Sequence, residues 1–312
     1  MQAKRDISIV LITYNHNKFI REAINGILIQ DLSNVLEIII ADDASIDNTC
    51  SIINEFHFPE SCTVRKIFRT ENVGMNKNIL EALKLAKGEF VALFEGDDYW
   101  TDPQKCSKQA QILRKNPDFS FCWHPVTAIN TQNYPEGPSV LTFDVALFNH
   151  FIPTCSLMYR RNMLNEIPDF LYKAMSLDIS IELLLLMQGP AYKLDEVMGV
   201  RYKHPKGISS DKEYLKGVFH NRIEIFWNLN SHSRFRYKKL FHKKIYEIAK
   251  IELSRAEHQY SFKQRLRQFN FLIITAPSNF EGVLELLRFL LVRLTQWFKF
   301  RLVGFKLFFK HD

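Results

Sequence analysis

The stretch EFVALFEGDDYW, residues 89–100, decides the fold, because in it a buried strand runs directly into a pair of acids. Residues 90–94 form an unbroken apolar run, which is typical of a strand covered on both faces. Asp97 and Asp98 follow shortly after it. A helix cap or a turn does not require two adjacent carboxylates, and such a pair repels unless a cation lies beside it. The stretch therefore predicts a strand whose carboxyl end holds a cation.

The segments that precede this stretch repeat one pattern, a short apolar run followed by turn-forming residues and an amphipathic segment. We expect buried strands at residues 7–12 and 35–41 and a third strand at 64–68, with helices at 18–30, around 52–53 and at 76–87. Strands that alternate with helices form βαβ units, whose right-handed crossovers produce a parallel sheet. The sequence therefore predicts an α/β fold with a Rossmann-like, mostly parallel sheet flanked by helices.

Polar side chains follow three of these strands at the point where each strand ends. They are Thr13, Tyr14 and Asn15 after the first strand, Asp42 and Asp43 after the second, and Asp97 and Asp98 after the fourth. Any one of them alone would be explained as a helix cap or a turn residue. Because the carboxyl ends of parallel strands meet at the edge where α/β sheets bind ligands, the three clusters together indicate a ligand site.

The composition excludes several classes of protein. With 46% apolar and 24% charged residues, the chain is neither disordered nor collagen-like. Its five cysteines are irregularly spaced and contain no CxxC pair, which argues against a disulfide framework or a zinc site and fits a reducing compartment. No uncharged apolar run reaches about 18 residues, so we expect no transmembrane helix. The apolar run at the N-terminus is too short for a signal peptide.

Three segments carry a resemblance to a known family. SIVLITYNHNKFIREAINGILIQ (8–30), EIIIADDASIDNT (37–49) and ENVGMNKNILEALKLAKGEFVALFEGDDYW (71–100) resemble, in order and spacing, the N-terminal half of family 2 glycosyltransferases. The resemblance is strong over residues 6–125, weakens up to about residue 215 and is absent beyond. It implies the GT-A fold and a catalytic domain over residues 1–215 that binds a nucleotide sugar.

The resemblance also implies how the nucleotide is bound. Tyr14 is similar in position to the aromatic residue that stacks on the base of the donor. Asp43 resembles the carboxylate that accepts a hydrogen bond from that base, Thr13 lines the same pocket, and we assign Asn15 to it as well. A further set resembles the family's N-x-G-x-x-x-N stretch below the nucleotide, namely Asn72, Gly74 and Asn78.

The acidic stretch stands where the family has its metal-binding Asp-x-Asp motif, here with Glu95 as the first acid. The resemblance implies that Asp98 ligates the metal directly and that Asp97 contacts the ribose or the sugar. A hard cation, Mn²⁺ or Mg²⁺, bound by one or two carboxylates and by diphosphate oxygens is the usual arrangement.

The second half of the chain offers a base and another metal ligand. Asp178 opens an apolar helix over residues 179–187, where the resemblance places the catalytic base; a first-turn acid that compensates the helix dipole is the alternative. Glu182, one turn further, is a fallback for the base. His204 resembles the histidine of the family's closing segment, which can ligate the metal or hydrogen-bond the leaving diphosphate. A surface histidine in a basic loop is the alternative.

The charge is distributed unevenly along the chain. Residues 216–312 carry 19 basic and 7 acidic residues, a net charge of +12, whereas residues 1–215 carry −5. We expect a basic, largely helical C-terminal region over residues 216–312. In residues 280–310, basic side chains share one sector of an apolar helix that contains Trp297, which suits binding to an anionic membrane surface. Packing on the catalytic domain or on a second subunit is the alternative. No nucleic-acid motif accompanies the charge, so no nucleic-acid partner is expected.

These observations lead to one functional hypothesis and two alternatives. The hypothesis is a metal-dependent, inverting glycosyltransferase that moves a sugar from a nucleotide-diphosphate sugar, with a UDP-sugar favoured, to a hydroxyl of a glycan or lipid-linked acceptor in surface polysaccharide synthesis. We expect it in the cytoplasm, on the inner face of the cell membrane. The alternatives are a non-catalytic, membrane-associated adaptor that retains the fold and a sugar-phosphate nucleotidyltransferase. The second would need a Gly-rich phosphate loop, and the segment after Ile12 contains none.

Overall fold

The computed structural model describes residues 5–205 and 207–255. The chain divides into two compact units, Met1–Leu229 and Asn230–Asp312, so the first unit continues past residue 215, where we expected the boundary. Within the described ranges, no helix is both long enough and apolar enough to cross a membrane. The predicted membrane-surface segment, residues 280–310, lies outside the described residues.

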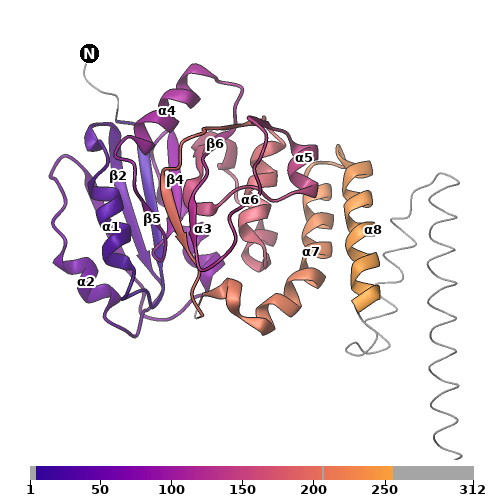
Figure 1. Cartoon of the computed structure of the whole chain (residues 1–312), viewed down its shortest axis with the longest axis horizontal. Coiled ribbons are helices and arrows are strands. Elements are labelled where there is room, and N and C mark those ends of the chain that lie inside the picture. The colour runs from indigo at the N-terminus through magenta and orange to yellow at the C-terminus, as the bar shows by residue number, and fades with distance from the viewer. Residues whose placement is uncertain (1–4, 206, 256–312) are drawn as a thin grey trace, which may run out of the picture. The chain divides into compact units, whose positions relative to one another are not determined.

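The first unit is built on two sheets (Figure 1). The strands of the large sheet are β1 (Ile7–Thr13), β2 (Val35–Asp42), β3 (Thr63–Phe68), β4 (Phe90–Glu95), β6 (Phe121–Trp123), β8 (Val140–Leu141), β9 (Met158–Arg160) and β10 (Ala191–Lys193). Their order is β3-β2-β1-β4-β9-β6-β10-β8, and the first four of these are parallel. The small sheet has the order β5 (Tyr99–Trp100), β11 (Gly199–Tyr202) and β7 (Thr127–Ile129). This confirms the α/β fold class.

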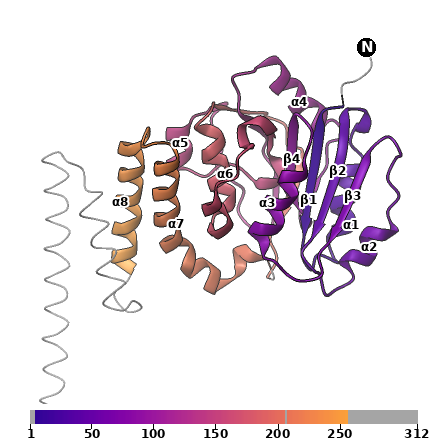
Figure 2. The same ribbon diagram turned by 180° about the vertical axis from the view of Figure 1, so that it is seen from behind.

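Helices cover both faces of the first four strands. The α-helices are α1 (Ile20–Leu28), α2 (Thr49–Glu55), α3 (Met75–Leu85), α4 (Lys105–Lys115), α5 (Phe143–Phe148), α6 (Leu177–Leu186), α7 (Lys212–His232) and α8 (Lys238–Arg255). Short 3₁₀ segments are η1 (Leu32–Asn34), η2 (Thr154–Ser156), η3 (Arg161–Leu164), η4 (Asp169–Lys173) and η5 (Ile208–Ser210). Figure 2 shows α3 in front of the sheet, while α1 and α2 lie on the other face. The expectation of a helical C-terminal region is confirmed as far as residue 255 by α7 and α8.

The strands predicted within the first hundred residues and the helices at 18–30 and 76–87 are confirmed, with ends that differ by no more than two residues. The helix expected around residues 52–53 is α2. Every residue of β1 is buried, because β1 lies between β2 and β4 and is covered on both faces. In α1 the buried residues recur at helical spacing: Ile20, Ala23, Ile24 and Ile27. Strand β9 was not predicted, and it enters the sheet antiparallel to both β4 and β6.

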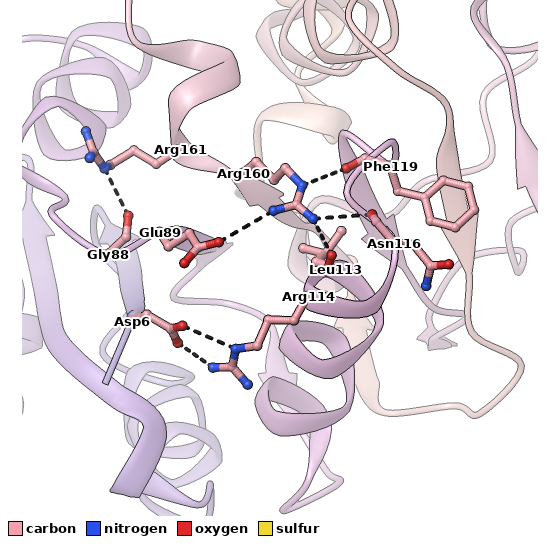
Figure 3. A network of polar contacts seen from close by, with 9 residues as sticks. All are labelled: Asp6, Gly88, Glu89, Leu113, Arg114, Asn116, Phe119, Arg160 and Arg161. Carbon is pink, nitrogen blue, oxygen red and sulfur yellow. Dashed lines mark hydrogen bonds and ion pairs between the residues drawn. The ribbon is translucent and has the colours of Figure 1, made fainter. Parts of the chain in front are cut away.

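Ion pairs fasten the amino end of the large sheet to α4 (Figure 3). Asp6, just before β1, forms a two-point contact with Arg114 at 2.5 and 3.2 Å. Arg160 lies 3.6 Å from Glu89 and also donates hydrogen bonds to backbone carbonyls at the end of α4, those of Leu113 and Asn116. The carbonyl groups that end a helix lack intrahelical partners, so this arginine both caps α4 and ties it to the sheet.

Candidate functional site

At the carboxyl end of the sheet, hydrogen bonds join the loops that follow β1 and β2. The amide of Asp43 donates to the carbonyl of Thr13 at 3.0 Å, and the side chain of Asn15 accepts the amide of Ile46 at 2.9 Å. Asn15 has a left-handed backbone (φ 56°), which this hydrogen bond supports. The hydroxyl of Thr13 is buried and has no hydrogen-bond partner among the described residues. Tyr14 is 42% exposed, so its ring is accessible at this edge.

The carboxylate of Asp43 fixes the backbone at the start of α3 through hydrogen bonds. Its two carboxylate oxygens accept the amides of Val73 at 2.8 Å and Gly74 at 3.0 Å, and Asn72 donates to its carbonyl at 3.2 Å. Gly74 has φ 89°, a conformation that favours glycine. The structure thus brings Asp43, Asn72 and Gly74 together, and their contact with a nucleotide stays a prediction.

The side-chain amide of Asn78 has protein partners at both ends. It is buried, donates to the carbonyl of Ala41 at 2.9 Å and accepts from Arg69 at 2.8 Å. Both ends of its amide are therefore engaged in joining α3 to the sheet.

Three acids lie at the end of β4 or just after it: Glu95 and Asp97 are partly buried, and Asp98 is buried. Burial raises the pKa of Glu95 well above its ordinary value, and the charges of Asp98 and Asp97 add to the shift. One carboxyl oxygen of Glu95 has no hydrogen-bond partner within the described chain. Burial, with the charge of Asp97, likewise raises the pKa of Asp98 to about 7. Two acids are thus held where ionisation is unfavourable, which is common at functional sites.

Asp97 differs from its neighbours because two histidines face it. Burial alone would raise its pKa, but the hydrogen bond to His204 and the charge of His16 bring the pKa below its ordinary value. Nε2 of His204 lies 3.1 Å from Oδ2 of Asp97. One ligand atom from each of His16, Asp97 and His204 lies within 4.8 Å of the others. A carboxylate and two imidazoles are donors that bind divalent metals, so these residues fit a metal ion.

The assignment of Asp98 as the direct metal ligand stays a prediction, and the structure adds Asp97 as a second candidate. His204 lies in the metal-competent cluster as expected, but the carboxylate beside it is Asp97 and not Asp98. Asp98 accepts the backbone amide of Tyr202 at 2.9 Å, which directs it toward β11. Sequence reasoning missed His16, whose only signal was its place in a loop of turn-forming residues after β1.

A cavity of about 280 Å³ joins the acids to the start of α6. Asp97, Asp98 and Asp178 all line it, and two arginines, Arg201 and Arg222, form part of its wall. Asp178 lies in the first turn of α6, and its charge acts on Arg222. The structure therefore brings the predicted base into one cavity with the predicted metal site.

Glu182, the fallback for the base, is placed differently. It is buried one turn further along α6 and lies 3.6 Å from Nδ1 of His150. Burial raises its pKa to about 7, against the opposing effect of His150. Glu182 is not among the residues that line the cavity, which leaves Asp178 as the carboxylate of α6 that faces it.

Comparisons with known proteins agree with this architecture. The family model "Glycosyl transferase family 2" matches residues 8–170. An uncharacterised protein of Mycobacterium tuberculosis is 38% identical over 210 residues, which cover 65% of this chain and 60% of that protein. The match therefore spans less than two thirds of that relative's length.

Solved structures show the same fold. The crystal structure of Staphylococcus aureus TarS 1–349 in complex with UDP-GlcNAc matches with a TM-score of 0.64 and 17% identity, over 87% of this chain and 82% of that chain. TarS is a poly(ribitol-phosphate) beta-N-acetylglucosaminyltransferase. The mannosyltransferase PcManGT from Pyrobaculum calidifontis, in complex with GDP-Man and Mn²⁺, matches with a TM-score of 0.56 and 15% identity, over 94% and 87% of the two chains. The fold is GT-A, as expected.

Proposed function

Because this chain belongs to glycosyl transferase family 2, we propose that it transfers a sugar, with inversion, from a nucleotide-diphosphate sugar to a hydroxyl group of its acceptor. A UDP-sugar is the favoured donor, and a glycan or lipid-linked polymer of the cell surface is the favoured acceptor. The polymer in the name of TarS supports an acceptor of this kind. An anionic membrane surface is the proposed partner of the C-terminal region.

The observation that carries this proposal is the common cavity of Asp178 and the acids after β4. In the proposed reaction Asp178 takes the proton of the acceptor hydroxyl while the oxygen attacks the anomeric carbon. The bond from that carbon to the diphosphate breaks on the opposite side, so a single displacement inverts the configuration. The position of Asp178 in the first turn of α6 keeps its carboxylate near the positive end of the helix dipole.

The donor set beside the cavity suits a divalent cation, Mn²⁺ or Mg²⁺. We assign Asp97 and His204 to hold it, since their ligand atoms are neighbours. Such a cation, when bound, stabilises negative charge on a diphosphate leaving group. Asp98 then has a positioning role, because its bond to the amide of Tyr202 orients the strand that leads to His204.

We propose that the nucleotide binds at the loops that follow β1 and β2. Tyr14 is exposed enough to stack on a base. The hydroxyl of Thr13 is buried beneath this edge and has no hydrogen-bond partner among the described residues. The remaining residues give this edge its shape through the contacts described above: Asn15, Asp43, Asn72, Gly74 and Asn78.

Replacement of the base tests the proposal. Asp178→Asn is expected to lower turnover of the best donor by roughly 10²–10⁴-fold, the usual contribution of a positioned base, while UDP binding stays within twofold or so. Asp144 is a matched control, because it is also a first-turn acid, in α5, and does not line the cavity. If Asp178→Asn is no slower than Asp144→Asn, the base is another residue and the proposed reaction loses its main support.

A further inference from the structure

We propose that His16, Asp97 and His204 form a three-ligand site that binds a transition-metal dication, such as Mn²⁺, before any nucleotide is present. This deepens the proposed function and rests on it for the purpose of the metal. Two protein ligands alone would leave the ion dependent on phosphate oxygens for its retention. A third ligand, from the loop after β1, would let the protein retain the metal ion without a nucleotide.

The spacing of the donor atoms supports a common ion. Two ligands at about 2.1 Å from one octahedral ion lie about 3.0 Å apart when adjacent and about 4.2 Å apart when opposite. Asp97 Oδ2 and His204 Nε2 are 3.1 Å apart, which is the adjacent spacing. The ligand atom of His16 lies within 4.8 Å of both. To share the ion it needs to come about 3.0 Å from one of them and no more than about 4.2 Å from the other.

One ring nitrogen of His16 lacks a hydrogen-bond partner among the described residues. Nδ1 of His16 is buried and has no hydrogen-bond partner in the described part of the chain. A buried polar atom without a partner costs free energy, and a cation at the cluster gives this ring a polar partner. The neighbouring Gly96 keeps room for the ring, because a Cβ there would lie only 3.0 Å from Nδ1.

The ring is also held in place from two sides. Phe19 packs edge-on against His16, with centroids 6.4 Å apart, and lies against His204 at 4.8 Å. The amide of Asn17 donates to Asp47 at 3.2 Å, which ties the His16 loop to the loop after β2. A histidine whose loop is fixed in this way is preorganised for ligation.

The ligand chemistry predicts which ions bind. Imidazole nitrogen suits Fe²⁺, Co²⁺ and Zn²⁺, and Mn²⁺ stands lowest among these ions in the Irving–Williams order. Mg²⁺ and Ca²⁺ are harder ions that favour oxygen and gain less from imidazole than Mn²⁺ does. With two imidazoles and one carboxylate, the site is expected to prefer Mn²⁺ to Mg²⁺ even without a donor molecule.

Titration of the chelator-stripped full chain with Mn²⁺ alone, followed by electron paramagnetic resonance, tests the proposal. We expect saturable binding of one ion without nucleotide, little displacement by an excess of Mg²⁺, and a Kd at least roughly tenfold higher in His16→Gln. Exposed His57 supplies the matched control, and His57→Gln should bind as the natural chain does. With Cu²⁺ as the probe, the spectrum should show two coordinated ring nitrogens in the natural chain and one in His16→Gln.

A second variant guards against loss of folding. Gly96→Ala leaves His16 in the chain, and its Cβ would lie 3.0 Å from His16 Nδ1 and from the Thr13 hydroxyl and 3.1 Å from Ile20 Cδ1. It should therefore weaken Mn²⁺ binding, and its thermal midpoint, compared with that of the control, shows that the chain is still folded. Absence of nucleotide-free Mn²⁺ binding, or equal binding by His16→Gln and the natural chain, overturns the proposal. Asp178→Asn distinguishes failure of the metal-site proposal from failure of the proposed sugar transfer. It removes the proposed base and should still give the Mn²⁺ signal, even if no sugar transfer is ever found.

Discussion

At the amino end of the large sheet, Asp6 faces Arg114 and Glu89 faces Arg160, whereas at the carboxyl end Glu95 and Asp98 have no lysine or arginine ion-pair partner among the described residues. Asp6 and Asp98 are buried to a similar degree, with 3% and 6% of their surface exposed. The carboxylate charge is thus balanced by an arginine at the amino end of the sheet and has no such ion pair, among the described residues, at the carboxyl end. Acids of the first kind support the fold, and acids of the second kind weaken it unless a ligand arrives.

The largest expected effect comes from removing the carboxylate charge of Asp97, which lies beside His16 and His204. Asp97→Asn should lower sugar transfer by about 10³-fold, because a metal stabilises the transition state by several kcal/mol. It should also remove the dependence of UDP binding on Mn²⁺, which calorimetry with and without the metal measures. Asp98→Asn is the decisive comparison: a greater loss of Mn²⁺-dependent UDP binding there would restore Asp98 as the direct ligand, as the sequence suggested.

The next effect is on stability and belongs to the opposite end of the sheet. Asp6→Asn should lower the free energy of unfolding by about 2 kcal/mol, a value reduced from that of a fully buried pair because the Arg114 side chain is 34% exposed. Urea unfolding measures this, and binding of UDP should not change. Glu55→Gln is the control, since its pair with Arg21 is open to solvent and should contribute little. Equal effects of the two substitutions would contradict the structural role of Asp6.

The smallest effect is a pH dependence of the metal-free protein. The pKa of Asp98 is about 7 in the folded chain and 3.8 in the reference state, so folding favours its protonated form. Its contribution to stability is complete below about pH 4 and is lost as the pH rises through 7. Between pH 6 and pH 8 the free energy of unfolding should fall by about 1.4 kcal/mol from this group. Asp98→Asn should flatten that difference, and a profile unchanged by the substitution would show that Asp98 is not the source.

The sequence was sufficient for β1, β2 and β4 because they are long and apolar, whereas β3 contains Arg65 and Lys66 and is only partly buried. Ile9, Leu11, Ile38 and Ile40 belong to runs that only a doubly covered strand explains. The three-residue strand β9 is too short to show periodicity, and its partners β4 and β6 lie well away from it in the chain. Pairing of that kind is decided by tertiary packing and leaves no local signal.

The site was predictable in part for the same reason. Asp97 and Asp98 stand directly after a recognisable strand, and Asp178 opens a recognisable helix. His16 was not found, because the meeting of His16, Asp97 and His204 depends on how three distant segments cross at one edge. The division of work between Asp97 and Asp98 was also beyond sequence reasoning, since it depends on which carboxylate the amide of Tyr202 reaches.

The place of β9 in the sheet has a consequence for synthesis on the ribosome. Strands β1 to β4 are complete once residue 95 has been made, but the strand that covers the free side of β4 ends at Arg160. During that interval the edge of β4 offers unpaired amides and carbonyls to any nascent chain nearby. Slow translation or depletion of chaperones should therefore favour mispairing at this edge, and truncation before residue 158 should yield a product that aggregates.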